Sequence, residues 1–254
     1  MKNILLFLFI FELLIPFAFS QSGDHNASSP LRGGRYTKTV EYNLLRPIIG
    51  YNYNSKDDVE KLFFGDFNAP VEFFFDGHDG EYYGFRIVRD TLKMSYFLEI
   101  KYISNDKEAR NEASRKYPLR GISSREKSSI PKDSLEQIMK QNIENREKYF
   151  EERNKLFKIE SRSFSISDKF AEKMYEKMVS VIDNFKARGV PPFINGGYSV
   201  TFRAAVDDNE LWTLKIHVPT GNALKWSDFC IQIVKEKDSK KIKESTYIKL
   251  LDDF

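Results

Sequence analysis

The chain has 254 residues and a nearly balanced charge, with 40 lysines and arginines against 37 aspartates and glutamates. This balance argues against a nucleic-acid binder that depends on phosphate contacts. A single cysteine, Cys230, excludes an internal disulfide and a zinc site built from several thiolates. The core must therefore hold without cross-links, which is reasonable for a chain of this length.

The N-terminus has the order of a secretory signal. A basic residue precedes a nearly continuous apolar run over residues 4–15, and residues 18–20 (Ala-Phe-Ser) have the small-x-small pattern of a cleavage site. We predict a signal peptide at residues 1–20 and export of the protein, either to the periplasm or out of the cell. The run is short for a transmembrane helix, so we expect no membrane span after cleavage. Residues 21–35 are small and polar, which predicts a flexible leader.

Residues 36–117 are predicted to form a first hairpin-helix unit. The segment 70–75 (PVEFFF) is typical of a strand. Residues 82–89 and 93–103 follow, and apolar and polar side chains alternate along the second of these segments, as in a hairpin with one buried face. A polar helix is expected over residues 106–116.

The middle of the chain is predicted to be a loop followed by helices. Residues 118–134 lack periodicity, which indicates a linker or an exposed loop. A long helix is expected over residues 132–157, and residues 159–166 (IESRSFSI) predict a strand. An amphipathic helix over residues 168–188 should follow, with Ser167 or the next residue as its N-cap.

A second hairpin gives the clearest pattern in the chain. Residues 198–206 and 212–218 alternate apolar and polar side chains, and a helix is expected at residues 222–235. With the preceding helices these elements form a unit over residues 135–236, and residues 237–254 are predicted to be a charged tail. The overall prediction is an α+β fold of antiparallel β-hairpins packed against amphipathic helices. The shared strand-strand-helix order also raises the hypothesis of two related units.

The run YSVTFRAAVDDNELWTLKIHVPTGNALKWSDFCIQIV contains two alternating strands, an Asp-rich turn, a corner with Gly221, and a helix. In these features residues 168–236 resemble the second half of a TonB C-terminal-like domain, which implies a fold for this segment. The corner reads Pro-Thr-Gly where that family has Ser-Ser-Gly, and no proline-rich linker follows the predicted signal, so the resemblance implies little about receptor coupling. The chain as a whole resembles exported proteins of Bacteroidota, which implies a location and no mechanism.

The polar face of the second hairpin supplies the leading candidate site. Thr201, Arg203, Lys215 and His217 alternate with the apolar residues and so share one face. If this face is open, they form a small anion or carboxylate site in which the arginine is the bidentate donor. The alternative interpretation is an ordinary solvated sheet face.

A second candidate lies in the DGHDG loop. Asp76, His78 and Asp79 provide an imidazole and two carboxylates, the groups used in acid-base hydrolysis. The secreted hydrolase that they suggest is an alternative function, although the glycines already explain the loop as a hairpin turn. The loop offers too few ligands for a metal site.

A third hypothesis is a carbohydrate or cell-wall binder that uses the exposed rings of Tyr51, Tyr82 and Tyr83. Cys230 falls on the apolar stripe of its expected helix, so we interpret it as a buried hydrophobe rather than a nucleophile. No sequence motif of a known catalytic or nucleotide-binding class occurs. We therefore predict a non-catalytic binding or interaction module of the cell envelope, without a cofactor, whose partner is a protein or another envelope component.

Overall fold

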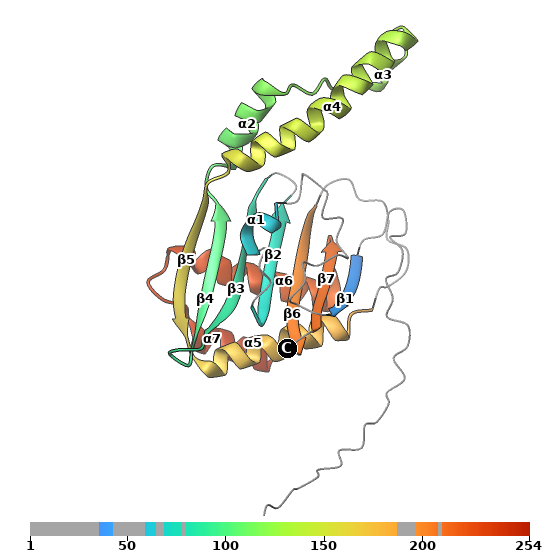
Figure 1. Cartoon of the computed structure of the whole chain (residues 1–254). Coiled ribbons are helices and arrows are strands. Elements are labelled where there is room, and N and C mark those ends of the chain that lie inside the picture. Colours follow the sequence, from blue (N-terminus) through green and yellow to red (C-terminus); the bar gives the residue numbers. More distant parts are fainter. Residues whose placement is uncertain (1–35, 43–58, 65–68, 78–79, 187–196, 208–209) are drawn as a thin grey trace, which may run out of the picture.

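The computed structural model describes residues 36–42, 59–64, 69–77, 80–186, 197–207 and 210–254 (Figure 1). The predicted signal peptide and leader lie outside this part of the chain. The strands are β1 (Tyr36–Tyr42), β2 (Val71–Gly77), β3 (Tyr82–Asp90), β4 (Ser95–Ile103), β5 (Ile159–Ile166), β6 (Tyr198–Asp207) and β7 (Glu210–His217). The helices are α1 (Lys61–Phe64), α2 (Asp106–Lys116), α3 (Ser124–Lys127), α4 (Lys132–Leu156), α5 (Asp168–Asp183), α6 (Gly221–Lys235), the 3₁₀ helix η1 (Glu236–Asp238) and α7 (Glu244–Asp252).

The strands form one sheet in the order β1-β7-β6-β2-β3-β4-β5, and every neighbouring pair is antiparallel. The predicted α+β class of antiparallel hairpins packed against helices is therefore confirmed. The two predicted strand-strand-helix units share this sheet, because β2 of the first pairs with β6 of the second. β1 joins the far edge beside β7. The two units that follow one another along the chain are thus not separate folding units in space.

Helices α5, α6 and α7 cover one face of the sheet and bury the main core (Figure 1). The predicted stripe of α5 is buried at Phe170, Met174, Met178 and Ile182, and the Ser167 hydroxyl accepts the N-cap hydrogen bond from the Phe170 amide. Burial of apolar side chains of this size is a main source of the free energy that stabilises a fold.

The segment predicted as a charged tail belongs to this core. It contains η1 and α7, and α7 packs against α5. Tyr247 of α7 is buried against the ring of Phe229, with the two centroids 5.5 Å apart. The lysines of the segment lie at the surface, while the apolar patch at residues 247–251, which suggests a helix in the sequence, belongs to α7.

A smaller apolar cluster lies on the opposite face, beneath α1. It contains Val59, Phe63, Phe64, Phe74 and Tyr82. The ring of Phe64 packs on Gly84, where a Cβ would come within 2.3 Å of the Phe73 carbonyl oxygen, so only glycine fits. The Lys101 ammonium donates a hydrogen bond to the Phe63 carbonyl oxygen at 2.7 Å. This contact fixes the end of α1 on the sheet.

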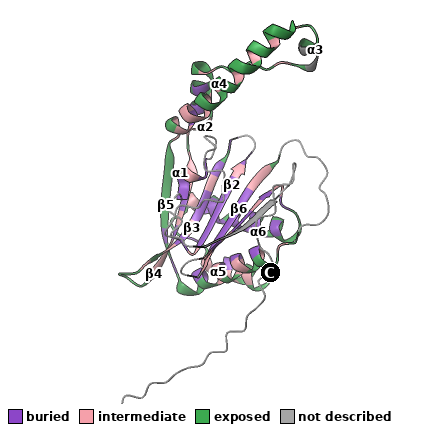
Figure 2. Cartoon of the chain, turned by 45° about the vertical axis from the view of Figure 1, so that its right-hand side comes forward, coloured by how far each residue is buried: buried purple, intermediate pink, exposed green. Residues whose placement is uncertain are grey.

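Between β4 and β5 the chain leaves the sheet as a projecting arm made of α2, α3 and α4 (Figures 1 and 2). The first part of the predicted loop over residues 118–134 is held against α4 by hydrogen bonds. The Asn142 side chain accepts a hydrogen bond from the Arg120 amide and donates one to the Arg120 carbonyl, at 2.9 and 2.8 Å. A capping box between Ser123 and Glu126 begins the short helix α3. The arm is therefore an ordered element.

Arg153 joins the base of this arm to the sheet. It is 3% exposed, and its guanidinium carbon lies 4.9 Å from the ring centroid of Phe150 and 5.2 Å from that of Phe157. The ring of Tyr82, which belongs to β3, lies 5.9 Å away. Cation–π contacts of one desolvated guanidinium contribute about 2 kcal/mol in all. The Phe150 and Phe157 contacts lie within α4 and its C-cap, and the Tyr82 contact joins the base of the arm to the sheet.

Candidate functional site

A row of alternating charges crosses the sheet face that carries α1. Arg203 lies opposite Glu72, Glu72 opposite Arg86, and Arg86 opposite Glu99. Arg203 Nη1 is 3.4 Å from Glu72 Oε2, and Arg86 Nε is 2.5 Å from Glu99 Oε2. Opposite charges on directly facing residues stabilise strand pairing. The polar positions of four neighbouring strands, β6, β2, β3 and β4, are thus matched to one another in register.

Glu60 immediately precedes α1 and contacts three of the four residues in the leading candidate site, one of which, Arg203, also belongs to the row of charges. Its carboxylate accepts hydrogen bonds from Arg203 Nη2 and from the Thr201 hydroxyl, the latter at 3.2 Å. Lys215 Nζ lies 3.7 Å from the same carboxylate. The sequence therefore grouped Thr201, Arg203 and Lys215 correctly on one face, but it missed Glu60, which lies more than a hundred residues earlier.

The charge network is buried. Arg203 is 4% exposed and Thr201 1%, while their carboxylate partners Glu60 and Glu72 are 5% and 2% exposed. The expected anion site required an open face, and the Arg203 guanidinium instead binds carboxylates of its own chain. Of the predicted residues only Lys215 and His217 are partly exposed. A role in ligand binding stays a prediction for them.

The protonation of Glu72 follows from this burial. Desolvation raises the pKa of its carboxyl to about 7; the charge of Arg203 lowers the pKa and that of Glu60 raises it. Its Oε1 atom has no hydrogen-bond partner among the described residues. Glu99 behaves differently: burial alone would raise the pKa of its carboxyl, but the hydrogen bond and charge of Arg86 hold that pKa below its usual value. The pKa values of the two carboxyls in this row are thus shifted in opposite directions.

His217 lies at the end of β7 in another row. Its Nδ1 atom is 3.1 Å from the hydroxyl oxygen of Ser199 on β6, and Ser199 lies opposite Asp76 on β2. In a Ser-His-Asp relay the imidazole stands between the hydroxyl and the carboxylate. Here the serine is in the middle, so this row does not have the order of that relay. His78 and Asp79 of the hydrolase hypothesis lie outside the described residues.

The remaining candidates fall in the interior or outside the described part. Tyr82 is buried, Tyr83 stacks on Phe75 with a centroid distance of 4.4 Å, and Tyr51 lies outside the described residues. Cys230 is fully buried, and burial raises the pKa of its thiol well above the ordinary value, which suppresses the nucleophilic thiolate. Within the described residues no group of three or more histidine, cysteine or acidic side chains could hold a metal ion.

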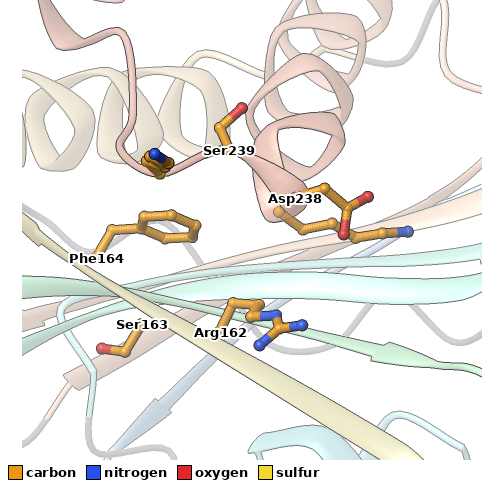
Figure 3. A pocket seen from close by; sticks show the side chains of 7 residues that line it. Arg162, Ser163, Phe164, Asp238 and Ser239 are labelled. Atoms are coloured by element: carbon orange, nitrogen blue, oxygen red, sulfur yellow. The ribbon is translucent and has the colours of Figure 1, made fainter.

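A cleft of about 350 Å³ lies between β5 and the segment that begins at η1 (Figure 3). Its lining consists of Arg162, Ser163, Phe164, Lys237, Asp238, Ser239 and Lys240. Figure 3 shows Arg162 on the strand side and Asp238 and Ser239 on the η1 side, with the ring of Phe164 between the two layers. Arg162 and Lys240 are exposed, whereas Phe164 is buried. The cleft thus has an apolar floor and a charged rim.

The rim carries an excess of positive charge. Three of the lining residues are basic and one is acidic, and residues 235–243 contain five lysines. Glu160, one step along the same side of β5, accepts a hydrogen bond from the Tyr102 hydroxyl at 2.6 Å. Lys237 Nζ lies 4.3 Å from the centroid of the same Tyr102 ring. Exposed guanidinium and ammonium groups with neighbouring serine hydroxyls can hold carboxylate or phosphate oxygens.

The two segments that line this cleft were both visible in the sequence, but nothing in the sequence indicated that they lie close together. The lysines near residue 240 were attributed to a solvated tail, and Arg162 is an ordinary polar position of an alternating strand. About 75 residues separate the two segments along the chain. Only the packing of η1 against the core beside β5 brings them together.

No family model, curated protein or solved structure matches the chain. The resemblance of residues 168–236 to a TonB C-terminal-like domain therefore stays a prediction. Within the described ranges, no helix combines the length and the apolar character needed to cross a membrane.

Proposed function

We propose that this protein is an exported, non-catalytic interaction module that binds an anionic group of a partner protein or envelope component. The observation that carries the proposal is the cleft between β5 and η1, whose rim has three basic residues against one acidic residue. The other strong positive charge of the predicted site, Arg203, is already neutralised by Glu60 and Glu72. The hydrogen bond from Tyr102 lowers the pKa of the Glu160 carboxyl, and Glu160 lies close enough to Arg162 and Lys237 for their charges to lower that pKa further. With this residue counted, the rim still has three basic against two acidic side chains, and this remaining excess is what would attract an external anion.

The groups on the rim favour binding over chemistry. Guanidinium and ammonium groups keep their charge over the physiological pH range, so they attract and orient an anion without exchanging protons with it. The serine hydroxyls add hydrogen bonds whose direction adapts to the ligand. Because the charges are solvent-exposed, the affinity should fall as the salt concentration rises.

Binding of an acidic peptide tests the proposal. Isothermal titration with an oligoglutamate peptide should give saturable binding that the double variant Arg162→Ala/Lys240→Ala weakens by about tenfold. The matched control is Lys140→Ala/Lys148→Ala, which removes the same charge from exposed positions of α4. Equal weakening by both variants would show a nonspecific effect of net charge, and no binding at all would overturn the proposed site.

Export has its own test. N-terminal sequencing of the protein from its native host should start near Gln21, in material recovered from the periplasm or the medium. A chain that begins at Met1 and is recovered from the cytosol would contradict export, whatever the cleft binds.

A further inference from the structure

β5 presents a free edge beside the cleft. It is the last strand in the sheet order, and β4 is its only strand partner in the described part of the chain. The hydrogen bond from the Ser104 amide to the Lys158 carbonyl, at 3.0 Å, fixes which residues bond to β4, because bonded pairs alternate along an antiparallel ladder. The peptide groups of Ser161, Ser163 and Ser165 therefore point away from β4. All three serines are exposed.

We propose that the edge of β5 accepts an extended acidic segment of a partner protein as an additional antiparallel strand. The inference rests on the proposed function and specifies how the anionic partner is held. Unpaired N–H and C=O groups on an edge strand are a template for another chain, and strand addition is an established mode of peptide recognition. Antiparallel addition continues the pairing found between all neighbouring strands of the sheet.

The alternation of side chains defines the sequence that fits. Every second residue of an added strand, about 4.8 Å from β5, points to the face on which Arg162, Lys237 and Lys240 line the cleft. An acidic side chain opposite Arg162 reaches the basic rim, and this is the position that carries the charge argument, because the position opposite Glu160 faces a carboxylate that the Tyr102 hydroxyl already binds. The intervening residues point to the opposite face, beside the serines of β5, where small polar side chains fit. The expected ligand thus alternates an acidic with a small polar residue.

Charge favours an acidic partner over a second copy of this chain. Pairing two β5 edges would bring two lysine-rich segments, each with five lysines over residues 235–243, to the same junction. Like charges brought together in this way disfavour association. An acidic segment instead neutralises the rim. Lys158, Glu160 and Arg162 also place charges along the strand, which is a common protection against self-pairing of edge strands.

A peptide that alternates glutamate and threonine tests the inference, with fluorescence anisotropy as the readout. In the proposed register each threonine lies opposite a β5 serine, and its backbone N–H and C=O bond to the edge, while the glutamate amides point to solvent. N-methylation of the threonine nitrogens should therefore weaken binding by at least about tenfold. N-methylation of the glutamate nitrogens is the matched control and should leave the affinity nearly unchanged. A lysine-threonine peptide should not bind.

The outcomes separate the two proposals. If both N-methylated peptides bind as well as the parent, the cleft recognises charge alone; strand addition is then overturned and the proposed function survives. If only the glutamate-methylated peptide loses affinity, the antiparallel register is refuted. If no acidic peptide binds in any form, both proposals fail.

A variant of the protein gives an independent check. Ser163→Pro removes a backbone N–H that points away from β4. It should therefore lower the affinity for the unmethylated peptide by at least about tenfold without breaking the hydrogen bonds between β5 and β4. Ser163→Ala keeps the amide and should bind normally. Circular dichroism and thermal unfolding establish that both variants fold. A wild-type dimer in sedimentation that Ser163→Pro dissociates, with no effect of the variant on peptide affinity, would replace the acidic partner by a second copy.

Discussion

Glu72→Gln should remove a pH dependence from the stability of the protein. Burial raises the pKa of the Glu72 carboxyl in the folded state to about 7, from 4.5 for the unperturbed group. Because the folded pKa lies above the unfolded one, the folded protein binds more protons between these values, and its stability falls as the pH rises through this window. At about 1.4 kcal/mol per pKa unit, the wild type loses about 3 kcal/mol through this group between about pH 4.5 and pH 7.

Urea denaturation at several pH values measures the effect as the difference between wild type and variant. The glutamine keeps the shape of the side chain but does not ionise, so the free energy of unfolding of the variant should not fall between about pH 4.5 and pH 7 through this group. Relative to its value at low pH, the variant should therefore be more stable than the wild type above about pH 7. Glu99→Gln is the control. Arg86 lowers the pKa of Glu99, so that variant should alter the pH profile only on the acid side, where the wild type loses stability as Glu99 is protonated. Parallel profiles for wild type and Glu72→Gln would refute the burial argument.

Three further results are expected. Arg203→Ala should lower the free energy of unfolding by about 3–5 kcal/mol, because it removes the most deeply buried cation from the two buried carboxylates of Glu60 and Glu72. Lys215→Ala, at the partly exposed edge of the same network, should cost less than about 1 kcal/mol in the same urea titration. Arg153→Ala should destabilise the arm by about 2 kcal/mol and speed hydrogen exchange and proteolysis in α4; unchanged exchange at its base would contradict the role of the aromatic contacts. Cys230 should react with a thiol reagent only at the rate of unfolding, and rapid labelling of the folded protein would disprove its burial.

Local pattern was enough to predict most of the regular elements. The strand over residues 159–166 and the helix over residues 106–116 have the predicted bounds, and the two hairpins end within about two residues of them. These segments have a clear period of two or a helical composition, and their environment agrees with their intrinsic preference. The N-cap at Ser167 was equally readable, since a serine before an amphipathic stripe is a common start signal.

The long-range arrangement could not be read in this way. The pairing of β2 with β6 joins residues more than a hundred positions apart, and no local pattern specifies it. For the same reason no partner of Arg203 could be predicted from the sequence, although Glu60 and Glu72 are the groups that pair with it. The cleft depends on a similar long-range contact between β5 and η1. What the pattern did show was that Thr201, Arg203, Lys215 and His217 share one face.

The central strands of the sheet are enclosed on both broad sides, by helices on one and by α1 with its matched ion pairs on the other. Under the proposed function, a change of ligand preference would arise at the perimeter, beside β5 and η1. Substitutions there alter the surface without touching the interior. The exposed residues of this rim could be replaced to change which ligand the cleft would bind. The buried salt bridges and aromatic rings would still hold the fold together.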